Sequence, residues 1–198
     1  MKYLILKPQR CELVEKQSRF IAIALPCASI DAFKLRKAEL ELEFPDARHI
    51  TYAYIIQDQD QIYQRFHDAD EPAGTAGRPI LMHISGRQLF NIVIFVVRYF
   101  GGIKLGAGGL MRAYGAAARQ VLDEATLAPF VPLTLLTLEL PYSAQNRLDY
   151  LAKKHGAVIL DRTFSEQLVC RIQIPLEEKA AFLALLPSLV KEQEEEGL

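Results

Sequence analysis

Hydrophobic and polar positions in the first part of the chain predict strands around one helix. Residues 12–26 contain two extended runs on either side of the segment KQSRF. A helix is predicted from an N-cap at Asp31 to about Phe44, because Pro45 cannot continue it. The run HITYAYII is rich in β-branched and aromatic residues and predicts a strand. The polar turn QDQDQ separates it from a second short strand, IYQRF.

The clearest hydrophobic pattern lies in the middle of the chain, on either side of a glycine-rich segment. Leu89–Tyr99 is apolar nearly throughout, which is typical of a strand that is buried on both faces. After the glycines, an apolar stripe with helical spacing predicts a helix. Arg112 and Arg119 are seven residues apart, so they should project from roughly the opposite face. The stripe consists of Leu110, Tyr114, Ala117, Val121 and Ala125.

A new set of elements begins after residues 128–134 (APFVPLT), whose two prolines are typical of a linker between domains. The segment TLLTLEL predicts a strand, and the next helix should run from a cap at Ser143 to about His155, before Gly156. The segments AVILDRTF and EQLVCRIQI predict a hairpin, and Leu176–Val190 predicts a last helix. The acidic tail EQEEEGL could add an edge strand or fray. This β-α-β-β-α order is the pattern of a ferredoxin-like module.

These patterns predict an α+β protein with two domains, residues 1–130 and residues 134–198. The composition is that of a soluble globular protein, with 51% hydrophobic and 24% charged residues among 198. The longest apolar run is too short to span a bilayer, and the N-terminus lacks a signal-peptide pattern. The three cysteines are widely scattered, so neither a zinc site nor a disulfide framework is expected. A cytoplasmic location fits this cysteine usage best.

Charge is distributed unevenly along the chain, although the net charge is only −1. Between Pro72 and Leu122 there is no Asp or Glu, whereas nine of the eleven glycines fall there. A basic, glycine-rich segment of this kind is a candidate platform for an anion. The alternative interpretation is a core-forming segment that excludes acidic residues. The basic residues of the segment are Arg78, Arg87, Arg98, Lys104, Arg112 and Arg119.

The glycines of residues 101–109 lie where the predicted strand gives way to the predicted helix. A glycine loop in this position leaves backbone N–H groups free, and the helix dipole favours phosphate or carboxylate there. Neither a Walker A motif nor a dinucleotide-binding fingerprint is present. Tight packing of strand on helix is the alternative explanation. The predicted RNA- or phosphate-binding residues are Arg78, Arg98, Gly101, Gly102, Lys104, Gly106, Gly108, Gly109 and Arg112.

The segment HDADEPAGTAGRP gathers a histidine and three carboxylates within residues 67–71. They could form a hard-metal site or an acid/base pair. The alternative is an acidic turn in which Asp70 and Glu71 accept hydrogen bonds from nearby backbone N–H groups. No hydrolase signature occurs in the chain, and no cysteine lies in a catalytic context. We therefore predict no catalytic residue, no metal site and no cofactor.

The motifs DADEPAGTAGRPIL and VVRYFGGIKLGAGGLMRAYG closely resemble the signature of the IMPACT/YigZ family, and KQSRFIA and FPDARH match its flanking blocks. The resemblance covers essentially the whole chain. It implies a first domain like domain 2 of ribosomal protein S5 and a second like the ferredoxin-like domain V of elongation factor G. Eukaryotic members regulate translation under amino-acid starvation by competing for a partner of the starvation-sensing kinase. The family-motif loop here comprises Asp68, Asp70, Glu71, Pro72, Gly74, Thr75 and Gly77.

The chain departs from the family motif at two adjacent positions. The family usually reads Asp-Asp-Gly-Glu-Pro, whereas Ala69 and Asp70 occupy the second and third positions here. The carboxylate lost at Ala69 argues against metal chemistry in this loop. Asp70 could also need a backbone conformation different from that of glycine.

Three functions are compatible with these observations, and the first is favoured. It is a non-catalytic regulator of translation whose glycine loop contacts RNA or the ribosome, with Arg48 and Arg119 as further candidate contacts. Bases could stack on Tyr99, Phe100 or Tyr114 if these are exposed, although Tyr114 lies on the apolar stripe of the predicted helix and is expected in the core. The second is an enzyme acting on a nucleotide or a phosphorylated small molecule, in which Asp68 or Glu71 holds Mg²⁺ or acts as base. The third is a protein-interaction module that docks a partner in translation control. No membrane partner is expected.

Overall fold

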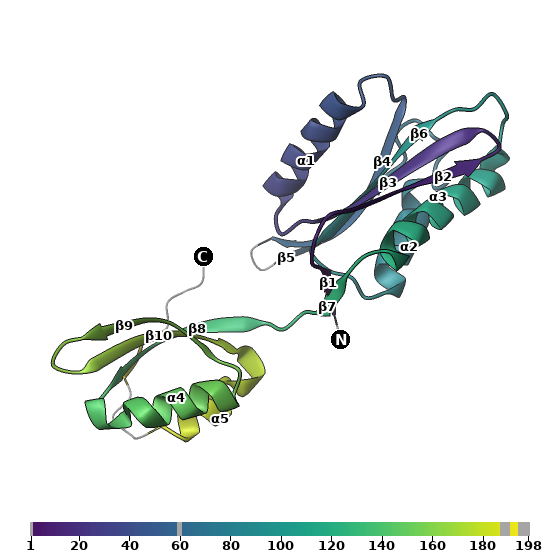
Figure 1. Cartoon of the computed structure of the whole chain (residues 1–198). Coiled ribbons are helices and arrows are strands. Elements are labelled where there is room, and N and C mark those ends of the chain that lie inside the picture. Colours follow the sequence, from purple (N-terminus) through teal and green to yellow (C-terminus); the bar gives the residue numbers. More distant parts are fainter. Residues whose placement is uncertain (1, 59–60, 187–190, 194–198) are drawn as a thin grey trace. The chain divides into compact units, whose positions relative to one another are not determined.

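The computed structural model describes residues 2–58, 61–186 and 191–193, and it shows an α+β chain (Figure 1). The chain divides into two compact units, Met1–Phe130 and Val131–Leu198. The division falls inside the proline-containing segment after strand β7 (Leu127–Pro129). Strand β7 pairs antiparallel with β1 (Tyr3–Ile5), so the beginning and end of the first unit lie together. Among the described residues, no helix combines the length and apolar character needed to cross a bilayer.

The first unit is built on a five-stranded antiparallel sheet in the order β2-β3-β6-β4-β5. Its strands are β2 (Gln9–Glu15), β3 (Ser18–Pro26), β4 (His49–Asp58), β5 (Gln61–His67) and β6 (Ile92–Tyr99). Strand β6 is central, and all its residues up to Arg98 are buried, which confirms the prediction of burial on both faces. The strand begins at Ile92 rather than Leu89, because Asn91 has a left-handed backbone (φ 50°) that interrupts extended structure.

Helices cover both faces of this sheet (Figure 1). Helix α1 (Ile30–Glu43) packs on the face that carries Val93, Phe95 and Val97 of β6. Helices α2 (Gly77–Gly86) and α3 (Gly106–Asp123) pack on the opposite face. The predicted stripe of α3 is confirmed from Leu110 to Val121, while Ala125 lies beyond the end of the helix. Arg112 and Arg119 are exposed, as predicted.

Two predicted helix caps are wrong. Helix α1 is capped by Ser29, whose Oγ accepts a hydrogen bond from the Ala32 backbone N–H at 3.1 Å, and not by Asp31. Asp31 lies inside the first turn and pairs with Lys34 instead. Ser143 lies within a 3₁₀ turn at Tyr142–Ala144 that precedes the next helix, so its side chain caps no helix.

The second unit has a four-stranded antiparallel sheet in the order β11-β8-β10-β9, with two helices on its buried face. The predicted β-α-β-β-α order is observed, and the tail adds the edge strand β11. Its elements are β8 (Leu133–Leu140), α4 (Gln145–Lys154), β9 (Val158–Phe164), β10 (Leu168–Pro175), α5 (Lys179–Ala184) and β11 (Lys191–Gln193).

The last helix is shorter than predicted. A 3₁₀ turn at Leu176–Glu178 precedes α5, and the helix ends at Ala184 with Leu185 as its C-cap. The remainder of the predicted helix, residues 187–190, lies outside the described residues, as do residues 194–198 of the tail.

Candidate functional site

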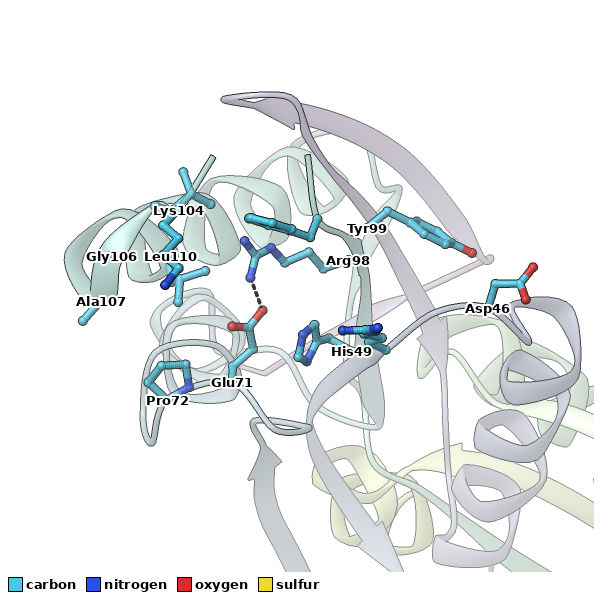
Figure 2. Close-up of a pocket in the computed structure, with 13 residues that line it drawn as sticks. Asp46, His49, Glu71, Pro72, Arg98, Tyr99, Lys104, Gly106, Ala107 and Leu110 are labelled. Carbon is cyan, nitrogen blue, oxygen red and sulfur yellow. Dashed lines mark hydrogen bonds and ion pairs between the residues drawn. The ribbon is translucent and has the colours of Figure 1, made fainter. Parts of the chain in front are cut away.

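A pocket of about 680 Å³ opens in the first unit where helix α3 begins (Figure 2). Its walls come from the start of β4, the loop between β5 and α2, the loop after β6 and the first turn of α3. Arg98, Glu71, His49 and Lys104 face a common space, whereas the side chains of Asp46 and Tyr99 point away from it (Figure 2). The lining residues are Asp46, Arg48, His49, Glu71, Pro72, Arg98, Tyr99, Phe100, Lys104, Leu105, Gly106, Ala107 and Leu110.

A buried ion pair lies at the base of this pocket. Arg98 Nη1 donates to Glu71 Oε1 at 2.6 Å, and the two side chains are only 7% and 4% exposed. Tyr114 Oη donates to the same oxygen at 2.8 Å. Burial, reinforced by the charge of Glu71, raises the pKa of the Tyr114 phenol far above its ordinary value, so Tyr114 remains a donor. The cluster ties the β5–α2 loop to the central strand and to α3.

The guanidinium of Arg98 also lies close to two aromatic rings. It lies 5.5 Å from the ring centre of Phe20 and 5.7 Å from that of Phe100. Its Nε–H is buried and finds no acceptor among the residues that the structure describes. A buried donor without an acceptor is costly, so this guanidinium has unused hydrogen-bonding capacity beside the pocket.

Asp68 organises the family-motif loop by binding backbone. Its Oδ2 accepts from the Gly74 N–H at 2.8 Å, and its Oδ1 accepts from the N–H groups of Ala76 and Gly77 at 3.0 and 2.8 Å. The loop is therefore an acidic turn, but the carboxylate that binds backbone N–H groups is Asp68 and not Asp70 or Glu71. Thr75 is buried, and its Oγ1 donates to the Pro72 carbonyl at 2.6 Å.

The four acidic and imidazole groups of residues 67–71 do not converge. His67 Nδ1 accepts from the Ala69 N–H at 3.0 Å, Asp68 binds backbone, and Glu71 binds Arg98 and Tyr114. Within the described parts of the chain, no group of three His, Cys, Asp or Glu side chains is placed to hold a metal ion. The possible metal site considered for this loop is therefore not formed by its own residues.

Asp70 adopts the backbone conformation that glycine favours. Its φ is 65°, and that of the preceding Ala69 is 47°. Asp70 therefore occupies a left-handed conformation that a glycine would adopt without strain. The left-handed region is strained for a residue with a Cβ, although Asp tolerates it better than most.

The change Asp70→Gly should therefore stabilise the protein by about 0.5–1 kcal/mol, because it removes this strain at an exposed position. Thermal unfolding followed by circular dichroism measures the effect. Asp70→Ala is the matched control, since it also removes the carboxylate but retains the Cβ. An Ala variant as stable as the Gly variant would show that the carboxylate, and not the backbone, is responsible.

Two features of the loop between β6 and α3 require glycine. A Cβ on Gly101 would lie 2.0 Å from the Gln17 carbonyl carbon, because the loop crosses directly over the β2–β3 turn. The Gly101 N–H donates to Ser18 Oγ at 3.1 Å, which fixes this crossing. Gly102 and Gly106 have φ of 88° and 72°, so they supply left-handed turns before and at the start of α3.

The first turn of α3 is free to receive an anion. All of that turn is described, and it contains neither a side-chain cap nor an acidic residue. Lys104 precedes it, and Arg112 folds back over it, with Nη1 about 3.6 Å from where a Cβ on Gly108 would be. Neither cation forms an ion pair with any residue that the structure describes. Two cations beside the positive end of a helix dipole favour the binding of a negatively charged group there.

The structure brings together only part of the predicted binding set. Arg98, Lys104 and Gly106 line the pocket, but Arg98 is buried and neutralised by Glu71. Arg78 is exposed on α2 outside the lining residues. Gly101 and Gly102 shape the loop without lining the pocket. Gly108, Gly109 and Arg112 are not among the residues that line the pocket, and Arg112 lines two smaller hollows instead.

Several residues of the site could not be assigned from the sequence. Tyr114 lies in the core, as expected, but the sequence did not show that its hydroxyl donates a hydrogen bond to Glu71. Ser18, which accepts from the loop, lies in the segment KQSRF without any feature that marks this role. Arg48 was noted as a further contact and does line the pocket. His49 also lines it, and its Nδ1 donates to the Ala69 carbonyl at 2.7 Å.

Comparison with known proteins identifies close relatives. The family model of the Impact N-terminal domain matches residues 16–122. The chain is 36% identical over 172 residues to the IMPACT family member YigZ of Escherichia coli. The aligned residues cover 86% of this chain and 84% of YigZ. It is 42% identical over 139 residues to an IMPACT family member of Thermus thermophilus, covering 70% and 73%. A crystal structure of a hypothetical protein superposes with a TM-score of 0.68 and 30% identity, covering 100% of this chain and 98% of that one.

Proposed function

Since the chain belongs to the IMPACT/YigZ family, we propose that it is a non-catalytic regulator of translation that binds RNA, free or within the ribosome. The family resemblance implies that eukaryotic members regulate translation, and this supports a role in translation for the present chain. The proposed contact surface is the pocket at the start of α3 together with the glycine loop that leads into it.

One observation carries the proposal: unpaired positive charge gathers around an uncapped helix N-terminus. Lys104, Arg48 and the first N–H groups of α3 surround one pocket, while the negative charge of Glu71 is already engaged by Arg98. Backbone N–H groups at a helix start bind phosphate well, and nearby cations add charge-assisted contacts. Phe100 lines the same pocket and is 56% exposed, so it offers a ring on which a base can stack.

The two units are proposed to be the modules that the family resemblance implies. The β-α-β-β-α-β order and the antiparallel sheet β11-β8-β10-β9 support a ferredoxin-like second unit. The first unit is proposed to resemble domain 2 of ribosomal protein S5. It contains a glycine-rich crossing from β6 into α3. Fold alone does not determine function, so the proposal depends on the pocket.

The change Lys104→Glu should weaken binding of single-stranded RNA about tenfold at roughly 100 mM salt, because it places a negative charge at the phosphate position. Fluorescence anisotropy with a labelled RNA 12-mer measures this. Wild-type binding should also fall steeply as salt is raised, since phosphate contacts release counterions.

Lys7→Glu is the matched control, because it makes the same change of charge at an exposed residue outside the pocket. It should bind RNA almost as the wild type does. If both variants lose RNA affinity equally, the affinity depends only on the net charge of the protein, and the pocket is not the site that contacts RNA. Failure of the wild type to bind RNA or ribosomes at low salt would overturn the proposed function.

A further inference from the structure

The carboxylate of Glu71 uses only one of its two oxygens for the buried cluster. Arg98 and Tyr114 both donate to Oε1, and the other oxygen is turned away from Arg98 towards the pocket (Figure 2). Since the side chain is 4% exposed and held from two sides, that oxygen has a fixed position. The pocket therefore combines the basic side chains of Arg48 and Lys104 with one rigid hydrogen-bond acceptor, the second carboxylate oxygen of Glu71.

The free oxygen of Glu71 determines which chemical group of a bound ligand can lie next to it. Phosphate oxygens are repelled by a carboxylate, so they should lie at the α3 N-terminus and Lys104 instead. A neutral hydroxyl group that donates a hydrogen bond is favoured beside the carboxylate, because bonds to a charged acceptor are strong. In a nucleic acid, the group that lies next to the phosphate and can donate in this way is the 2′-hydroxyl of ribose.

We propose that the pocket distinguishes RNA from DNA, with Glu71 accepting a hydrogen bond from a ribose 2′-hydroxyl while the adjacent phosphate lies on the start of α3. This assignment rests on the proposed function and adds to it the chemical feature that the site reads. Arg98 and Tyr114 are positioning residues, because they hold Glu71 and do not touch the sugar. Phe100 at the rim contributes stacking without regard to the sugar.

The assignment is tested with three oligonucleotides of one sequence on the unmodified protein. They are a 12-mer of RNA, its 2′-fluoro analogue and its DNA counterpart with deoxyuridine for uridine. The 2′-fluoro analogue keeps an RNA-like sugar conformation but cannot donate a hydrogen bond. RNA should bind about tenfold more tightly than both other oligonucleotides, which should bind alike.

A double variant, Glu71→Leu with Arg98→Met, removes the acceptor without leaving an unpaired buried charge. It should bind RNA and the 2′-fluoro analogue equally, provided that its circular dichroism shows a folded protein. Equal binding of RNA, 2′-fluoro RNA and DNA by the wild type would overturn this inference and leave RNA binding itself intact. Persistence of the RNA preference in the folded double variant would show that another group reads the sugar. Binding of none of the three would overturn the proposed function instead.

Discussion

Replacing Arg98 with Met is expected to lower the free energy of unfolding by about 3–5 kcal/mol, one of the two largest effects that we predict. The substitution leaves the carboxylate of Glu71 buried, with Tyr114 as its one remaining hydrogen-bond donor among the residues that the structure describes. An unpaired buried charge costs far more than the pair contributes, because the desolvation of Glu71 is no longer offset. Urea unfolding followed by circular dichroism measures the loss.

The double variant Arg98→Met with Glu71→Leu is the control for this result. Apolar side chains of similar volume in place of both partners should restore most of the lost stability, since no buried charge then remains. A loss of less than about 1 kcal/mol for the single variant would mean that the buried charge of Glu71 does not depend on Arg98 for its stabilisation. In that case the pair would not be the rigid base of the pocket.

The change Gly101→Ala is expected to destabilise the protein by about 3 kcal/mol or more. The new methyl group would lie 2.0 Å from the Gln17 carbonyl carbon and 2.1 Å from its oxygen. Backbone atoms cannot move aside as the end of a flexible side chain can. The loop must therefore separate from the β2–β3 turn, which also breaks the hydrogen bond to Ser18. Thermal unfolding measures the effect directly.

Gly108→Ala is the matched control within the same glycine segment. A Cβ at Gly108 would meet only the flexible end of Arg112, at 3.6 Å, and Ala favours the helix by about 0.5–1 kcal/mol over Gly. This variant should therefore be as stable as the wild type or more stable. Equal losses for Gly101→Ala and Gly108→Ala would contradict the view that the close approach of the Gln17 backbone causes the loss at Gly101.

The hydrophobic pattern predicted most of the fold. The central strand and the buried stripe of α3 were recognisable because apolar periodicity reports burial directly. The start of β6 was misplaced because a left-handed Asn91 leaves no trace in hydrophobicity. The two caps were misassigned because Ser29 and Asp31 are both capable cap residues, and backbone geometry decides between them.

The candidate site was only partly predictable, because its groups come from distant segments. Glu71 and Arg98 are 27 residues apart, and each reads in the sequence as a potential surface charge. Only the fold places them together and turns both inward. The same holds for Asp68, whose role depends on how the loop curls around its carboxylate. By contrast, the segment that holds Lys104 and the glycines stands out in the sequence, because it is basic, rich in glycine and placed between a predicted strand and a predicted helix.

Binding of RNA phosphate at the start of α3 is tested by a titration of the ¹⁵N-labelled protein with a single-stranded RNA 12-mer. We expect the largest changes in backbone amide shifts at Lys104, Gly106, Ala107 and Gly108, and we expect them to reverse when salt is added. Changes confined to α1 or to the second unit, with these four amides unmoved, would contradict this expectation.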